Sequence, residues 1–154
     1  MPLETDLFAR AEHAAQEPRV VAAALRSFYA LADRWQLSVS DGARLLGGIP
    51  HRTYLAWRKT PPERIPPDCM LRMWYVNHVA LLLERLFAGA PEVANGWMQR
   101  PNMNPLFSGR PPIAFVLGGG PLALDQLYGW LHSAIGGGGS VLVKSSPTAF
   151  STTP

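Results

Sequence analysis

The chain has 154 residues, 47% of them hydrophobic, and a formal net charge of +3 at pH 7; this allows one hydrophobic core or two small ones and excludes a large multidomain protein. The single cysteine excludes a disulfide framework and a cysteine-rich zinc site. No apolar run approaches the roughly 20 residues that a membrane-spanning helix needs, and the N-terminus lacks the basic start and apolar core of a signal peptide, so we expect a cytoplasmic protein with no membrane segment.

Two amphipathic helices are predicted at the start of the chain. The first covers residues 3–16, where apolar residues recur at helical spacing, and it ends before Pro18. Pro18 suits the first turn of the second helix, because a helix leaves its first N–H groups unbonded. The second helix carries an apolar stripe formed by Val21, Leu25, Phe28, Ala32 and Trp35.

The next two helices have the size and punctuation of a helix-turn-helix. Ser38 or Ser40 can cap the first helix, and the second covers residues 51–59 after a turn that contains two glycines. Two helices of about eight residues, joined by a turn of three to four residues, are typical of this motif. The second helix is then the recognition helix.

This second helix lies in a basic stretch. Between Arg44 and Lys59 the chain has four arginine and lysine residues and no carboxylate. In helix-turn-helix proteins the start of the recognition helix contacts base edges, and flanking cations contact phosphates. The predicted DNA-binding residues are therefore His51, Arg52, Thr53, Tyr54, Arg58 and Lys59. The alternative is that Tyr54, Leu55 and Trp57 are core residues and that the charged face is only solvated.

Residues 60–67 are predicted to be a stiff linker that separates the N-terminal helices, 1–59, from a second subdomain, because prolines such as those of TPPERIPPD (60–68) do not belong in a helix interior. Asp68 is predicted to cap a long helix over 68–88, whose apolar residues are too many for one stripe. Such a helix is buried on more than one side, against both halves of the molecule or against its twin in a homodimer. Five tryptophans and a charged fraction of only 16% also indicate apolar surface that a partner covers.

Prolines and glycines divide the remaining chain into shorter helices. One helix stops at Pro101, the next begins at Pro111 and ends at the glycines 118–120, and the last covers residues 121–135. Because few residues with strand preference precede the tail, the predicted fold class is all-α. The tail, 136–154, is rich in Gly, Ser, Thr and Pro and cannot form a core; its GGGGS start is also typical of an engineered linker.

The sequence carries no pattern that is typical of a catalytic or metal site. The four histidines are far apart, and Cys69 has no base and orienting acid placed near it in the sequence. The triple glycine of VLGGGPLAL follows no predicted strand and lacks the Gly-Lys-Ser/Thr of a phosphate-binding loop. We therefore expect no enzyme activity, no cofactor and no metal.

Three segments together resemble the Xre/MbcA/ParS-like antitoxins of bacterial toxin–antitoxin systems: LLGGIPHRTYLAW (45–57), LLLERLFAGAPEVANGWMQRPN (81–102) and NPLFSGRPPIAFVLGGG (104–120). The resemblance covers about residues 20–135. It implies an N-terminal Xre-type helix-turn-helix that represses its own operon by binding operator DNA. It also implies a toxin-binding domain, residues 68–135, that occludes the active site of a cognate RES-domain toxin, an enzyme that consumes NAD⁺ or transfers ADP-ribose. Such antitoxins are typically homodimers.

The same resemblance implies the toxin-binding residues. The motif residues are Trp97, Arg100, Pro101, Asn102, Phe107, Gly109 and Arg110. Trp97 and Phe107 are expected to be core residues, and the two arginines to make polar contacts. Tyr128 and Trp130, expected to be exposed, would suit an interface, although Tyr128-Gly129 stands where many relatives carry charged residues. The alternative function is a helix-turn-helix transcriptional regulator whose C-terminal half only dimerises.

Overall fold

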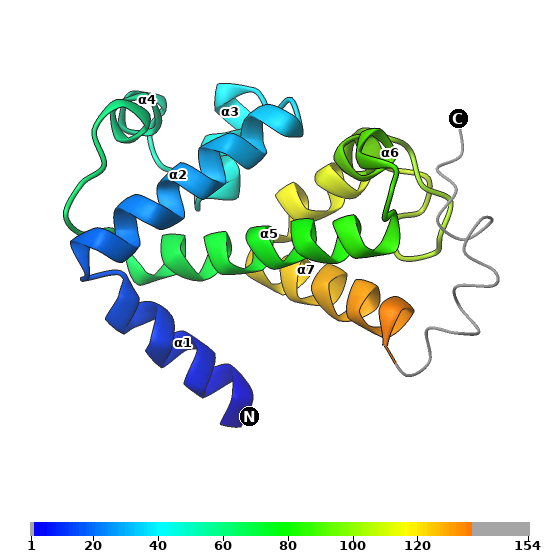
Figure 1. The fold of residues 1–154 in the computed structure, drawn as a ribbon, viewed down its shortest axis with the longest axis horizontal. Helices are drawn as coiled ribbons and strands as arrows, with labels where there is room; N and C mark the ends of the chain where they lie inside the picture. Colours follow the sequence, from blue (N-terminus) through cyan, green and yellow to red (C-terminus); the bar gives the residue numbers. More distant parts are fainter. Residues whose placement is uncertain (1, 137–154) are drawn as a thin grey trace. The chain divides into compact units, whose positions relative to one another are not determined.

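The computed structural model describes residues 2–136, and all the regular structure within them is helical, as the sequence predicted (Figure 1). The tail predicted at 136–154 lies outside the described residues apart from Gly136. The elements are α1 Pro2–Ala14, α2 Pro18–Arg34, α3 Val39–Leu45, α4 His51–Lys59, α5 Pro67–Leu86, α6 Pro91–Gly96, the 3-10 turn η1 Trp97–Gln99, and α7 Pro112–Ile135.

The chain divides into two compact units, the first ending at Asn77 and the second beginning at His78. The division falls inside α5, so the proline-rich segment predicted as a linker lies within the first unit. There the N–H of Ile65 donates to the carbonyl of Ala15 at 3.1 Å, and the Ile65 side chain is 5% exposed. These contacts tie the segment to the end of α1.

The core of the first unit is built on α2, which begins at Pro18 as predicted. The predicted apolar stripe is buried at all five positions, Val21, Leu25, Phe28, Ala32 and Trp35. Phe28 and Tyr29 pack edge-on against each other and against Tyr54 of α4, with ring centroids 4.9 to 6.4 Å apart. The hydroxyl of Tyr29 donates to the backbone carbonyl of Tyr54 at 2.6 Å, which fixes α4 against α2.

A serine cap fixes the start of α3, and two glycines allow the turn between α3 and α4. Ser38, rather than Ser40, caps α3: its Oγ accepts the N–H of Asp41 at 3.0 Å. Gly47 and Gly48 have φ of 109° and 83°, a left-handed conformation that glycine adopts without steric cost. The turn therefore forms where the sequence placed the chain reversal.

Helix α3 approaches α4 closely at Gly42. A Cβ added to Gly42 would lie 2.2 Å from the hydroxyl oxygen of Tyr54, well inside van der Waals contact. Only glycine fits at this point in the observed packing.

The long helix α5 begins at Pro67, directly before the residue predicted as its cap. Asp68 is the second residue of the helix and not its cap; its carboxylate accepts from Nε of Arg72 at 2.8 Å. Buried side chains lie on more than one side of the helix in each unit, including Met73 and Tyr75 in the first and Ala80 and Leu82 in the second, in agreement with the sequence.

The second unit packs α6, η1 and α7 around aromatic side chains. The helix break predicted at the glycines 118–120 appears as a kink in α7 at Gly120, where φ is 62° and ψ is −148°. Pro121 follows the kink directly and cannot donate a backbone hydrogen bond across it. The two helices predicted on either side of the glycines are thus the two segments of α7.

Candidate nucleic-acid and protein interfaces

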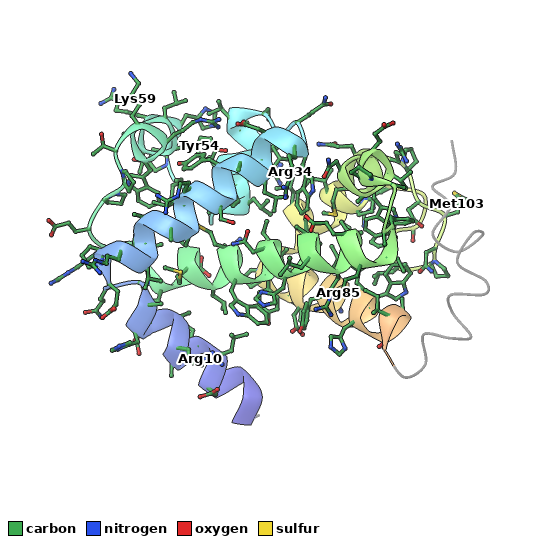
Figure 2. The ribbon with its side chains drawn as sticks, in the orientation of Figure 1. Arg10, Arg34, Tyr54, Lys59, Arg85 and Met103 are labelled. Atoms are coloured by element: carbon green, nitrogen blue, oxygen red, sulfur yellow. The ribbon has the colours of Figure 1, made fainter. Side chains whose placement is uncertain are left out.

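Helix α4 presents one exposed face. Residues at spacings of i, i+1, i+4, i+5 and i+8 share a helix side, and on α4 these residues are all exposed: His51, Arg52, Leu55, Ala56 and Lys59. We call this set the α4 face. Figure 2 shows Lys59 pointing outward from α4 and Tyr54 pointing inward toward α2. The α4 face carries two full positive charges and a histidine, and its helix is anchored by the buried side.

The buried side of α4 corrects one predicted base contact. The ring of Tyr54 is 3% exposed because it packs between α2 and Gly42 of α3, so it cannot contact DNA. This is the core role that the sequence left open as an alternative. Of the remaining predicted base contacts, His51 and Arg52 are exposed and Thr53 is half-buried.

Arg58 is an anchor of α4 as well as a surface cation. Its guanidinium pairs with the carboxylate of Asp33 and lies 5.3 Å from the ring centre of Tyr29. The hydrogen bond that the guanidinium donates to the Asp33 carboxylate raises the pKa of Arg58 above its usual value. Arg52 and Lys59, by contrast, have no ion-pair partner among residues 2–136. These two cations, rather than Arg58, are available to phosphates.

Leu55 and Ala56 belong to the α4 face but were not predicted as contact residues. Leu55 is 50% exposed. The alternative interpretation of the sequence, in which Leu55 is a core residue, is wrong at this position. Its position three residues after Arg52 and four after His51 is the pattern that could have placed it on their face.

The second unit buries three of the predicted toxin-binding residues. Trp97, Asn102 and Phe107 are each 0% exposed. Trp97 stacks on Trp130 at 6.1 Å with an interplanar angle of 21°, and Phe107 meets both rings edge-on. Trp97 and Phe107 are core residues, as the sequence favoured. Trp130, expected to be exposed, is partly buried because it completes this cluster.

Residues 102–110 form a loop that its own hydrogen bonds close. Asn102 donates its N–H to the carbonyl of Arg110 at 3.2 Å and accepts from the N–H of Gly109 at 2.8 Å. Its side-chain oxygen accepts from the N–H of Asn104 at 2.9 Å. Ser108 and Gly109 both have positive φ, 53° and 84°, which turns the chain back toward Asn102. The loop is therefore held in one shape by Asn102.

The outside of this loop combines cations with an apolar side chain. Arg100, Pro101 and Arg110 are exposed, and Met103 is 64% exposed. Figure 2 shows Met103 pointing outward from the chain between η1 and α7. Neither arginine pairs with a carboxylate among the described residues. We call Arg100, Pro101, Met103 and Arg110 the loop face. No sequence pattern marked Met103.

Two other predicted residues of the second unit, Gly109 and Tyr128, are less exposed than the loop face. Gly109 is half-buried at the closing turn. Tyr128 is half-buried on α7, with its ring 6.3 Å from that of His78 and 5.7 Å from that of His132. Both residues have contacts of their own within the unit.

The comparisons with known proteins find one curated relative to report. The uncharacterized protein y4oB of Sinorhizobium fredii (strain NBRC 101917 / NGR234) is 31% identical to this chain over 117 residues, which are 76% of this chain and 88% of y4oB. The chain belongs to the y4oB family. No model of a known protein family matches the chain, and no solved structure matches it.

The described part of this y4oB-family chain offers no cluster suited to metal chemistry: no three His, Cys, Asp or Glu side chains in it gather where they could hold an ion. Cys69 is buried, and its thiol donates to the carbonyl of Leu46 at 2.9 Å. Burial raises the pKa of this thiol to about 11, so little thiolate forms at neutral pH. No helix within residues 2–136 has the length and apolar character to cross a bilayer. The surfaces that remain as candidate sites are the α4 face and the loop face.

Proposed function

We propose that this chain is an antitoxin that binds operator DNA through α4 and neutralises a cognate toxin through its second unit. The observation that carries the DNA-binding part is the α4 face: two unpaired cations and a histidine on the outside of a short helix. The other side of that helix is locked by Tyr54, which packs against α2 and α3. A rigid, basic, exposed helix that follows another short helix after a turn of five residues, 46–50, suits insertion into the major groove.

In the proposed complex, each residue of the α4 face has a chemical role. Arg52, near the start of α4, reaches a guanine edge, where its guanidinium can donate two hydrogen bonds to O6 and N7. Leu55 contacts a thymine methyl group, and Lys59 neutralises a phosphate. Arg58 contributes by holding α4 to Asp33 of α2.

The DNA-binding proposal is tested by fluorescence anisotropy on DNA from the chain's own promoter. Arg52→Ala is expected to lower the affinity roughly tenfold or more, because a bidentate arginine–guanine contact contributes about 1–3 kcal/mol. Arg19→Ala is the matched control, since Arg19 is exposed on α2 and lies outside the α4 face. Equal affinities for promoter DNA and unrelated DNA, unchanged by Arg52→Ala, would reject the proposal.

The toxin-binding part is supported by the resemblance and by the loop face. An exposed methionine beside two unpaired arginines is a surface for a partner with an apolar pocket and acidic rim, because arginine and methionine are enriched in interfaces. The partner proposed is a RES-domain toxin that consumes NAD⁺, and the antitoxin acts in the cytoplasm by occluding its active site. The proposed active species is a homodimer formed through α5.

The proposal predicts that a RES-domain toxin is encoded beside the gene, and this toxin, once purified, is the reagent for the test. Adding the full chain in equimolar amount or slight excess is expected to stop NAD⁺ loss, and Met103→Ala or Arg110→Ala to weaken this inhibition. Undiminished toxin activity at excess chain would favour the alternative, a transcriptional regulator whose C-terminal half serves only to dimerise.

A further inference from the structure

A groove in the first unit lies between α2 and the end of α4. Its volume is about 350 Å³, at the small end of the range for small-molecule sites. It is lined by side chains of α2, by Trp57 and Arg58 of α4, and by Pro61. We propose that this groove binds a small aromatic molecule with one carboxylate group, of one or two rings.

The space exists because α2 presents small side chains there. Ala22, Arg26 and Ala30 follow one another at intervals of one helical turn and share a side of α2. Neither alanine can fill the gap to α4, and the exposed Arg26 side chain lines the groove. One side of the groove is therefore formed by two alanines, Ala22 and Ala30, with the cation of Arg26 between them.

The aromatic lining is held in place. Tyr29 lines the groove, and its hydroxyl is bonded to the carbonyl of Tyr54, so the ring cannot swing in to fill the space. Trp57 is half-buried and also lines the groove. Two aromatic side chains favour a flat apolar body, since rings gain from stacked or edge-on contact beyond the area that they bury.

The charges select a single carboxylate. Arg58 is compensated by Asp33, whereas Arg26 has no ion-pair partner among the described residues. The lining thus has one uncompensated positive charge. One arginine matches one carboxylate with two parallel hydrogen bonds, whereas a phosphate dianion would bring a second negative charge that this lining does not balance.

Binding to this groove does not depend on DNA or on a toxin, so its test is separate from those above. The probes are benzoate and indole-3-acetate, with the uncharged benzamide and indole-3-acetamide as matched neutral compounds. They are titrated into the full ¹⁵N-labelled chain, and amide shifts are followed by NMR. At least one acid is expected to give saturable shifts at Arg26, Ala30 and Trp57 with Kd of about 1 mM or tighter. The matched neutral compound, benzamide or indole-3-acetamide, is expected to bind several-fold more weakly.

Two variants and one control assign the site. Arg26→Gln is expected to reduce the affinity for the acid to that of its amide, and Ala30→Leu to abolish binding of both by filling the groove. Ala30 is exposed, so the leucine does not disturb the core, which thermal unfolding checks. Arg19→Gln, on the same helix outside the groove, is expected to leave binding unchanged. Absence of saturable shifts up to about 10 mM, equal affinity for acid and amide, or an unchanged affinity in Arg26→Gln would overturn the proposal.

Discussion

The contact between Gly42 and Tyr54 sets how closely α3 and α4 pack. We expect Gly42→Ala to lower the free energy of unfolding by about 1–3 kcal/mol, because the new methyl group overlaps the Tyr54 hydroxyl. Gly129→Ala is the matched control: Gly129 is exposed in α7, and an added Cβ would meet nothing within 4 Å. It should raise the stability by about 0.5–1 kcal/mol, because alanine loses less backbone entropy. Urea denaturation measures both; equal effects would contradict the close approach.

The protonation of Tyr29 makes the stability of the first unit depend on pH. Burial raises the pKa of Tyr29 well above its ordinary value of 10.0. The folded state therefore keeps the proton at a pH where the unfolded chain has lost it, so stability is full below pH 10 and falls above it. Tyr54 and Cys69 contribute in the same direction, because burial raises their pKa values also.

Tyr29→Phe separates the Tyr29 contribution. The variant is expected to lose about 1 kcal/mol at neutral pH, because the hydrogen bond to the Tyr54 carbonyl is gone. Its stability should fall less steeply above pH 10 than that of the parent chain. Urea denaturation between neutral pH and pH 11 tests this; an identical pH profile in the two proteins would show that Tyr29 titrates as in the unfolded chain.

For single residues, the sequence predicts burial correctly where residue type and helical spacing agree. The α2 stripe and the core positions of Trp97 and Phe107 were predicted from such patterns or from the resemblance, and they are buried. The burial of Tyr54 and the pairing of Arg58 with Asp33 could not be chosen from the sequence, because both depend on residues of α2 that lie 25 positions away.

At the scale of elements, α4 carries two exposed cations that a ligand can reach, Arg52 and Lys59. Lys59 lies in its last turn, has no ion-pair partner in residues 2–136 and is proposed to contact a phosphate. Lys59→Ala is expected to weaken binding to any DNA similarly. It should also reduce the slope of log K against log salt concentration by about one. A slope equal to that of the parent chain, measured by anisotropy over a salt series, would place Lys59 outside the interface.

The 102–110 loop depends on Asn102 for its shape. Asn102→Ala is expected to cost about 1–3 kcal/mol of stability, because the N–H of Asn104 loses its acceptor and a cavity forms. Met103→Ala, one residue away, should change stability by less than about 0.5 kcal/mol since the side chain is exposed. The same variant should weaken toxin binding. Thermal unfolding measures the structural role of Asn102, and a pull-down with the toxin measures the binding role of Met103. A large loss of stability in Met103→Ala would contradict the assignment of Met103 to the surface.

Helix boundaries were largely predictable, because prolines and glycines mark them: α2 and α4 begin where predicted, and α7 bends at the glycines. The closed loop was not predictable, because it depends on backbone bonds between Asn102 and residues 109–110 that no local preference specifies. For the same reason the proline-rich segment looked like a linker, although Ile65 ties it to the first unit.

At the scale of the whole molecule, the chain comprises two units that share one continuous helix, α5. The α4 face belongs to the first unit and the loop face to the second. Because the two faces lie in different units and share no residue, we expect variants in them to act independently, so that each proposed activity is lost without the other. We propose that this chain works by binding alone, with DNA on the α4 face and the toxin on the loop face.

The most direct test of that claim measures toxin inhibition by the Arg52→Ala variant. NAD⁺ loss is followed while the variant is titrated into the toxin, using the preparation whose promoter affinity has been measured. The account predicts inhibition at the same molar ratio as the parent chain, with DNA affinity reduced at least about tenfold. Loss of inhibition in step with DNA binding, or no inhibition by either protein, would contradict it.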